Sequence, residues 1–369
     1  MLEQKIQLLI DTYNSDVVRL SAVKDRETLS EMLDGSIKWT RAVKKDLANG
    51  IKYQFDPNAI EESYYRPFVK RKLYFNRQLN EMLYQVPQLF GPTAAANRAF
   101  CFSAEERSEF GVIAFDCVPN KDIFMPSAAQ VLALYRYSDG SKVDNITDWS
   151  LAQFKKHYKL PSPQPSPASG RGSRKGSGVE KAITKEAIFH YVYAVLHDPI
   201  YREKYVLNLK REFPRIPLYG ETDATFWQWA AWGEELMALH IGYENVAPAK
   251  LNRIDTPDEK SRKNAGIAYA PKAMLKADKE AGRIALDTET TLAGIPAAAW
   301  EYKLGNRSAL EWILDQYKEK KPKDPTIREK FDTYRFADYK EKVIDLLMRV
   351  TTVSVRTQEI VGAMRVWKR

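Results

Sequence analysis

The residues best suited to chemistry lie in one run where basic and aromatic side chains are interleaved. The run extends from Tyr64 to Asn80 and reads YYRPFVKRKLYFNRQLN. Cationic side chains can contact phosphates while aromatic rings pack or contact bases, so the run suits nucleic-acid binding. The same pattern is typical of an amphipathic hairpin whose rings are core and whose cations are merely solvated. The residues alone leave both interpretations open.

Eight basic residues are candidates for phosphate contacts. Five lie in this run, two lie in a short helix expected to end near Gly50, and one lies in a second basic group at residues 210–217, for which a solvated surface is the competing interpretation. The candidates are Lys44, Lys45, Arg66, Lys70, Arg71, Lys72, Arg77 and Arg215. Such contacts would position a duplex, whereas the loop side chains that read base edges are not identified by the sequence.

Several common catalytic signatures are missing from the sequence. It has no GxxxxGK[ST] phosphate loop and no Asn-Pro-Pro-Tyr or Asp-Pro-Pro-Tyr element of the kind that adenine methyltransferases use. Its four histidines and its two cysteines, Cys101 and Cys117, form no metal-ligand pattern. We therefore expect no catalytic residue, no metal and no cofactor in this chain.

Two alternatives from other functional classes stay open. Asp287 followed by Glu301 and Lys303 mimics the Asp…Glu-x-Lys arrangement of metal-dependent nucleases, although such a spacing arises readily by chance where 28% of the residues are charged. The other alternative is a scaffold whose N-terminal helix, with an apolar stripe that starts at Leu2 and Ile6, docks on a partner protein.

The chain is long enough for two or three structural units. It has 369 residues with a formal charge of +9, and 44% of them are hydrophobic, which argues against disorder as the default state. No stretch approaches the ~18–20 continuous apolar residues of a membrane span, and the start lacks the pattern of a signal peptide. A cytoplasmic protein without membrane contact is therefore expected. The positive charge is compatible with a polyanionic partner, but it is also ordinary for a soluble domain.

The patterning predicts an α+β fold with a β-rich first part and a mainly helical second part. Strands are predicted at residues 72–76, 99–103, 111–118 and 131–138. The expected units are a helical tail at 1–45, a β-rich part at 46–160, a flexible insertion rich in Pro, Ser and Gly at 161–178, and a mainly helical part at 179–369.

Capping residues mark helices in the second part. Asp198-Pro199 supplies an N-cap and a first-turn proline, and Ser308 with Glu311 has the spacing of a capping box. The Lys-rich stretch from Ala247 to Gly282 is expected to be a loop with one short helix. The segment from Val343 to Met364 contains β-branched residues but keeps helical spacing, which favours a helix.

Several longer stretches resemble the C-terminal specificity region of Type ISP restriction-modification enzymes. The matching stretches are YRPF at 65–68, LYFNRQLN at 73–80, FHYVYAVLH at 189–197, FPRIP at 213–217 and RSALEWILDQY at 307–317. Matches run from about residue 10 to residue 364. The stretch at 161–178 fits the family poorly and is interpreted as an insertion in a surface loop.

The resemblance implies a DNA target-recognition domain. Enzymes of this family join a nuclease, an ATP-driven translocase, an adenine methyltransferase and such a domain in one polypeptide, and residues 1–45 resemble the end of the methyltransferase domain. The implied partners are double-stranded DNA and a methyltransferase domain in the same or a partner polypeptide. S-adenosylmethionine, ATP and magnesium are then expected only for upstream domains. The resemblance implies that the chain holds the DNA while an adenine is flipped into the methyltransferase pocket. It also implies a role of the whole enzyme in phage defence.

Overall fold

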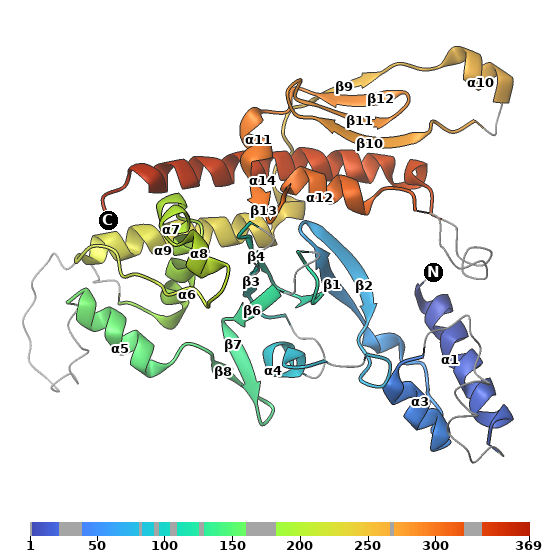
Figure 1. Cartoon of the computed structure of the whole chain (residues 1–369), viewed down its shortest axis with the longest axis horizontal. Helices are drawn as coiled ribbons and strands as arrows, with labels where there is room; N and C mark the ends of the chain where they lie inside the picture. The colour runs from blue at the N-terminus through green and yellow to red at the C-terminus, as the bar shows by residue number, and fades with distance from the viewer. Residues whose placement is uncertain are drawn as a thin grey trace, which may run out of the picture.

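The computed structural model describes residues 2–21, 39–80, 83–91, 96–103, 109–124, 129–159, 182–265, 269–320 and 334–369. Short strands lie at the centre of the molecule, long helices run along one side of them, and a further sheet lies beyond the helices (Figure 1). The fold class is α+β, as expected. The insertion predicted at 161–178 falls outside the described residues.

The N-terminal unit is a pair of helices with a small core of its own. Helix α1 (Leu2–Arg19) packs against α3 (Arg41–Ala48), which begins after the N-cap residue Thr40. The ring of Tyr13 stacks on that of Tyr53 with centroids 4.2 Å apart. The apolar stripe of α1 is therefore at least partly covered within the chain, by α3 and the segment that follows it.

The β-rich part consists of three small sheets, and the first two are interleaved along the chain because β5 lies between β4 and β6. The strand orders are β2-β1-β5, β4-β3-β6 and β7-β8. The strands are β1 (Ile60–Arg66), β2 (Val69–Tyr74), β3 (Ala99–Ser103), β4 (Val112–Phe115), β5 (Val118–Pro119), β6 (Ala129–Ala133), β7 (Tyr135–Ser138) and β8 (Ser141–Asp144). Short helices lie before, between and after the strands: η1 (Pro57–Ala59) precedes β1, α4 (Val86–Phe90) lies between β2 and β3, and α5 (Asp148–His157) follows β8.

Of the four predicted strands, the one at 99–103 coincides with β3, and the others are shifted or divided. The strand predicted at 111–118 breaks after Phe115, because β5 leaves the β3 sheet and pairs in parallel with β1 at Ser63 and Tyr64. The strand predicted at 131–138 is similarly divided into β6 and β7. Strand β1, which starts at Ile60, was not predicted.

The central sheet of β3, β4 and β6 has a core on each face. Cys101 and Phe115 belong to the larger core, whereas Phe100 and Phe102 pack with Phe189 and other residues of the helical part. Successive residues of a strand point to opposite faces, so a strand that is buried on both faces is apolar throughout. This sheet therefore joins the two parts of the chain.

Helices dominate the second part. They are α6 (Lys185–Val195), α7 (Pro199–Lys204), α8 (Val206–Leu209), α9 (Asp223–Ile241), η2 (Tyr243–Asn245), α11 (Ala297–Glu301), α12 (Ala309–Gln316), η4 (Phe336–Tyr339) and α14 (Lys340–Val366), with a short hairpin of β13 (Lys303–Leu304) and β14 (Arg307–Ser308). Asp198 caps α7, Ser308 and Glu311 form the expected capping box, and the predicted C-terminal helix is confirmed. Helices α6 and α9 approach so closely that a Cβ atom at Gly233 would lie 1.8 Å from the carbonyl oxygen of His190. None of the described helices is long and apolar enough to cross a membrane.

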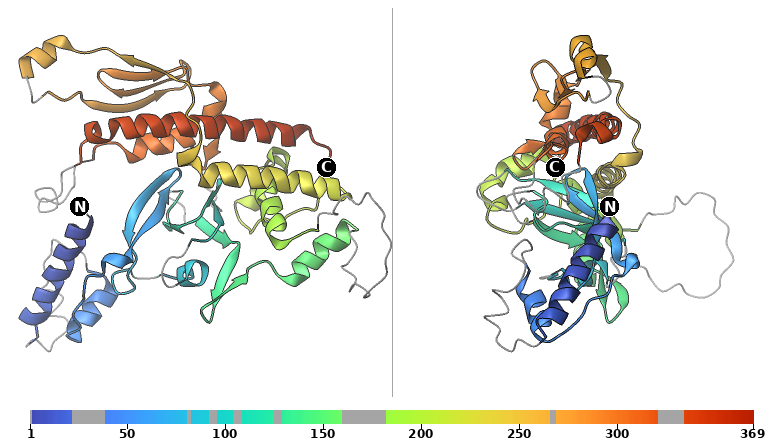
Figure 2. Two further views of the ribbon diagram at one scale, coloured as in Figure 1. Left: turned by 180° about the vertical axis from the view of Figure 1, so that it is seen from behind. Right: turned by 90° about the vertical axis from the view of Figure 1, so that its right-hand side faces the viewer.

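Of the loop with one short helix expected from Ala247 to Gly282, the short helix is confirmed as α10, but the loop is wrong. This stretch supplies β9 (Asn252–Asp255), α10 (Glu259–Ala265) and β10 (Ala273–Asp278), which join β11 (Arg283–Asp287) and β12 (Thr290–Ala293) in a four-stranded sheet of order β10-β11-β12-β9. Both views of Figure 2 show this sheet outside α14. Its inner face buries Leu275 and Ile284, while Lys276 and Arg283 point outward. Because exposed cations such as Lys276 and Arg283 occupy the outer face, the sequence did not show the apolar runs by which strands were predicted.

Candidate nucleic-acid interface

The basic-aromatic run forms an antiparallel hairpin of β1 and β2. Tyr64 pairs with Lys70 in the register, and the chain reverses at Pro67 and Phe68. Phe68 has a φ of 58°, a left-handed conformation that side chains other than glycine rarely adopt. Its backbone N–H donates to the Tyr64 hydroxyl at 3.0 Å. The tight turn thus places the cations of β2 beside the carboxylates of β1.

Three aromatic side chains of the hairpin, Tyr64, Phe68 and Tyr74, are buried in the core, whereas Tyr65 is half-buried. Tyr64 stacks on Phe115 with centroids 5.4 Å apart, and Phe68 meets the edge of Tyr243 at 5.2 Å. Tyr64 and Phe68 are 1% and 0% exposed. The burial of these rings agrees with the interpretation as an amphipathic hairpin. The rings of Tyr64 and Phe68 are not accessible to nucleic-acid bases.

Two of the candidate cations are largely withdrawn from solvent. Arg66 is 5% exposed, and its guanidinium lies over the Tyr65 ring and donates to the Tyr65 carbonyl at 2.7 Å. Lys70 lies 3.0 Å from a carboxylate oxygen of Glu244 and 3.3 Å from one of Glu62. Burial lowers the pKa of Lys70, but the two carboxylates more than offset this and raise the pKa above its usual value. The burial of Arg66 and the ion pairs of Lys70 argue against direct phosphate contacts.

Three cations of the run are exposed. The Arg71 guanidinium lies 5.4 Å from the Tyr317 ring centroid, which positions it at the end of α12. Lys72, opposite Glu62 in the register, and Arg77, just beyond β2, make no ion pair with any residue that the structure describes. These side chains are available to phosphates.

The two candidate lysines of α3 differ in exposure. Lys45 is exposed, and Lys44 is half-buried. The segment after α3 packs on the hairpin, because the ring of Phe55 stacks on that of Tyr74 at 5.7 Å and the Asp56 N–H donates to the Tyr74 hydroxyl at 3.0 Å. Leu79, just beyond β2, packs in the same small core as Val43 and Leu47 of α3 (Figure 1). The exposed cations of α3 and of the hairpin thus belong to neighbouring elements.

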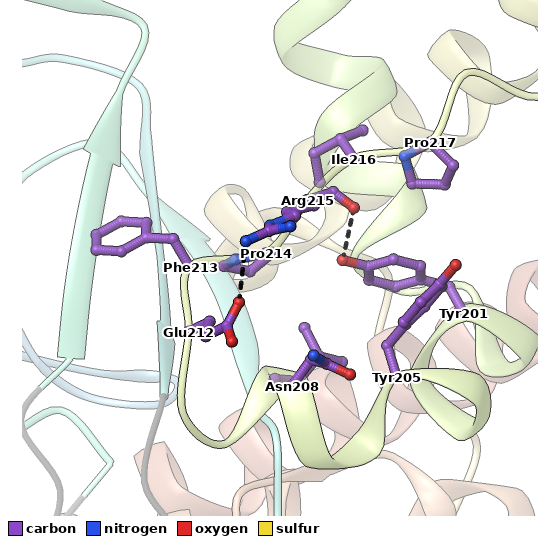
Figure 3. Close-up of a pocket in the computed structure, with 10 residues that line it drawn as sticks. Tyr201, Tyr205, Asn208, Glu212, Phe213, Pro214, Arg215, Ile216 and Pro217 are labelled. Atoms are coloured by element: carbon purple, nitrogen blue, oxygen red, sulfur yellow. Dashed lines mark hydrogen bonds and ion pairs between the residues drawn. The ribbon is translucent and has the colours of Figure 1, made fainter.

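The eighth candidate, Arg215, lies apart from these elements on the rim of a pocket of about 400 Å³ beside α7 and α8. Its side chain is 91% exposed and lies 3.4 Å from Glu212, as the dashed line in Figure 3 shows. The Arg215 carbonyl accepts a hydrogen bond from Tyr201 at 3.0 Å. Asn208 and Tyr205 line the opposite side of this pocket.

The pocket is next to exposed apolar side chains that the sequence analysis did not select. Tyr205, Val206, Leu207 and Phe213 are 37%, 50%, 67% and 60% exposed. The sequence carries no signal for this exposure, because consecutive aliphatic residues of a helix can both face the core, as Leu346 and Leu347 of α14 do. This segment therefore joins the candidate surface.

The three residues of the nuclease alternative have separate roles. The buried Asp287 carboxylate binds Lys340 at 2.7 Å and accepts two backbone N–H groups at the start of β12. Glu301 is exposed on α11, and Lys303 lies 3.5 Å from Glu109. In the described ranges, no group of three His, Cys, Asp or Glu side chains could hold a metal ion. Nothing here favours a nuclease.

Two of the four histidines are core residues with hydrogen bonds. His240 bonds the Tyr193 hydroxyl at 2.6 Å and the Thr357 hydroxyl at 3.0 Å, and His197 bonds the Tyr193 carbonyl at 2.8 Å. Burial, with a smaller contribution from nearby Arg202, lowers the pKa of His240 to about 3. A neutral His240 thus ties α6, α9 and α14 together.

Comparison with known proteins gives a consistent result. The model of the family described as the Type ISP C-terminal specificity domain matches residues 1–346. A chain of the DrdV–DNA complex is 46% identical with a TM-score of 0.85, and the match covers 100% of this chain and 34% of that one. No curated protein gives a significant match.

Two further solved structures share the fold. A nuclease-deletion mutant of the Type ISP restriction-modification enzyme LlaGI, in complex with a DNA substrate mimic, is 27% identical with a TM-score of 0.73 over 98% of this chain and 30% of that one. The ATP-dependent Type ISP enzyme LlaBIII bound to DNA is 22% identical with a TM-score of 0.71, covering 98% of this chain and 21% of that one. The chain thus spans about a third or less of the length of these relatives.

Proposed function

Because the chain belongs to the family of Type ISP C-terminal specificity domains, we propose that it binds duplex DNA and selects the target sequence for a Type ISP restriction-modification enzyme. The DrdV, LlaGI and LlaBIII structures contain DNA or a DNA substrate mimic, and each aligns with at least 98% of this chain. This similarity over the entire chain is the observation that carries the proposal.

The exposed cations of the hairpin and α3 supply a physical basis for phosphate contacts. Lys45, Arg71, Lys72 and Arg77 are exposed on adjacent elements, whereas Arg66 and Lys70 are buried or paired. Side chains that neutralise phosphates release condensed counterions, so affinity should depend on salt. These four residues are proposed to position the duplex, and other side chains would read base edges.

Salt-dependent binding tests this proposal directly. The full chain is titrated with duplexes that carry a random central segment, at several salt concentrations. Wild-type affinity should fall as salt rises, and replacing both Lys72 and Arg77 by Ala should reduce the slope of log K against log salt by about 1.8, or about 0.9 for each contact. Affinity that stays constant as salt rises would contradict phosphate contacts altogether.

A matched control is available on the outer sheet. Lys276 and Arg283 are also exposed cations of adjacent strands, but they lie on the outward face of β10 and β11. Replacing both by Ala changes the net charge equally and should leave the slope unchanged. An equal reduction in both double variants would show a general charge effect instead of an interface at the hairpin.

The catalytic activities of such an enzyme would belong to domains outside this chain. We propose that S-adenosylmethionine, ATP and magnesium bind those domains, and that the assembled enzyme acts on DNA in the cytoplasm. The chain should then restore site-specific adenine methylation to an enzyme whose own specificity domain has been removed. If the enzyme that carries this chain methylates the same target sequence as it did with its own specificity domain, a role of this chain in target selection is excluded.

A further inference from the structure

The segment around α8 exposes an apolar ridge between cations. Helix α8 (Val206–Leu209) has four residues, and its first two side chains, Val206 and Leu207, are 50% and 67% exposed. Lys204 precedes them, and Lys210 and Arg211 follow. A folded protein leaves two adjacent aliphatic side chains in water at a cost, so a contact with another molecule is indicated.

The base of this ridge is held rigidly. Tyr201 is 3% exposed on one side of the ridge and Leu209 is 2% exposed on the other. The Tyr205 ring packs against that of Tyr201, with centroids 5.2 Å apart, and the Tyr201 hydroxyl donates to the Arg215 carbonyl (Figure 3). A rigid ridge loses little conformational entropy when it binds.

The charges beside the ridge favour a polyanion over a protein partner. Among residues 203–215 the acidic side chains are Glu203, which pairs with Arg365 of α14, and Glu212, which pairs with Arg215. The centre of a protein–protein interface is depleted of charge. Here cations lie within three residues of each exposed aliphatic side chain. Proteins that distort DNA use this combination, with apolar side chains between base pairs and Lys or Arg on the flanking phosphates.

We propose that Val206 and Leu207 form a wedge that enters the minor groove and unstacks one base step, so that the bound duplex bends. Lys204 contacts a flanking phosphate. The proposal rests on the proposed duplex binding and adds a defined contact to it. Pyrimidine–purine steps unstack at least cost, and such a step is the expected position of the wedge.

A bending measurement tests the wedge. The wild-type full chain first selects its preferred duplex from a pool with a random central segment, and this duplex is then labelled with a fluorescence donor and acceptor at its ends. Energy transfer should rise on binding to wild type. For Leu207→Ala, transfer should stay near that of free DNA and affinity should fall about tenfold, with the salt slope unchanged. Lys204→Ala should lower the salt slope by about 0.9 and retain the bend.

The control and the contrary outcomes separate this inference from the proposed function. Leu8→Ala removes an aliphatic side chain that is 42% exposed on α1 and should change neither bending nor affinity. The wedge is overturned if wild type binds the duplex without bending it, or if Leu207→Ala bends the duplex as much as wild type does. Either outcome is still compatible with the proposed duplex binding. A Leu207→Ala chain that bends DNA normally but fails to associate with the methyltransferase polypeptide assigns the ridge to a protein contact and overturns the wedge. A wild-type chain that selects no duplex overturns both proposals.

Discussion

The β1–β2 hairpin and the segment at 204–215 have similar residue types but use them in opposite ways. In the hairpin, Phe68 is 0% exposed and Lys70 is held between two carboxylates. In the segment, Phe213 is 60% exposed and the side chain of Arg215 is 91% exposed. The hairpin therefore uses most of its aromatic surface for stability, whereas the segment retains apolar surface for contact with another molecule.

The difference follows from what surrounds each region. The hairpin is covered by helical elements, since Phe68 meets Tyr243 of η2 and Arg71 reaches Tyr317 beyond α12. The segment at 204–215 lies after a short helix that is anchored at its start by Asp198. Basic and aromatic composition alone thus does not identify the surface proposed to contact DNA.

Truncating the two phenylalanines gives the largest expected difference between the regions. Phe68→Ala should lower the free energy of unfolding by about 3–5 kcal/mol, because it leaves a cavity in the main core. Phe213→Ala should lower it by no more than about 1 kcal/mol, since its ring is mostly exposed and has an edge contact with Phe102. Denaturant titration of both variants measures this. Equal losses would show that the segment is as deeply packed as the hairpin.

Removing Asp198, which anchors the helix before the segment at 204–215, gives the second-largest expected loss in the free energy of unfolding. Asp198 is 0% exposed, caps α7 and accepts hydrogen bonds from Tyr219 and Arg369. Asp198→Ala should cost about 3 kcal/mol, because it leaves the Arg369 guanidinium without its buried carboxylate. Hydrogen exchange of α7 and α8 should rise together with this loss. The exposed Asp223 at the start of α9 provides the control, and a similar loss for Asp223→Ala would contradict a special role for the buried pair.

The pH dependence of stability tests the core behind the hairpin. The pKa of His240 is about 3 in the folded chain, and an unfolded histidine has one near 6.5. Below about pH 6.5 the unfolded chain binds a proton that the folded chain excludes, so stability falls as the pH is lowered toward about 3. The loss is about 1.4 kcal/mol per pH unit for each such histidine. The stabilising contribution is present above pH 6.5.

Denaturation at a series of pH values measures this slope. Burial also lowers the pKa of His197, so the two histidines should contribute together. His240→Gln should be less stable at neutral pH but should show a slope smaller by about one proton. A slope that His240→Gln leaves unchanged would mean that the loss at low pH arises in other groups.

The smallest expected effect is a difference in the salt dependence of duplex binding between variants of two lysines of β2. Lys72 is exposed without an ion pair among the described residues, whereas Lys70 bridges Glu62 and Glu244. Lys72→Ala should reduce the salt slope of duplex binding by about 0.9, and Lys70→Ala should leave it nearly unchanged. The same salt titrations measure both. A larger reduction for Lys70→Ala would mean that its ion pairs open when DNA binds.

Local signals predicted several elements correctly. The capping box of Ser308 and Glu311 was readable because its two hydrogen bonds join residues three apart. Strand β3 was readable because both of its faces are buried and every residue is therefore apolar or small. The helical period from Val343 to Met364 outweighed the β-branched residues and predicted α14.

Other elements depend on pairing between distant segments. Every residue of strand β9 is exposed, and the strand is held by pairing with β12, about forty residues away, and by the ion pair of Arg253 with Glu341. The Lys-rich sequence gave no sign of this sheet. The division between β4 and β5 also depends on a distant partner, because β5 pairs with β1 at Ser63.

The sequence by itself determined the α+β class, the main helices and the family, because these depend on local periodicity, caps and long specific stretches. Only the tertiary structure decided which cations face water: Arg66, Lys70 and Lys72 are neighbours in the sequence, yet one is buried, one is paired and one is exposed. The physical reason is that the environment of a charge is set by groups such as Glu244, which the fold brings from far along the chain.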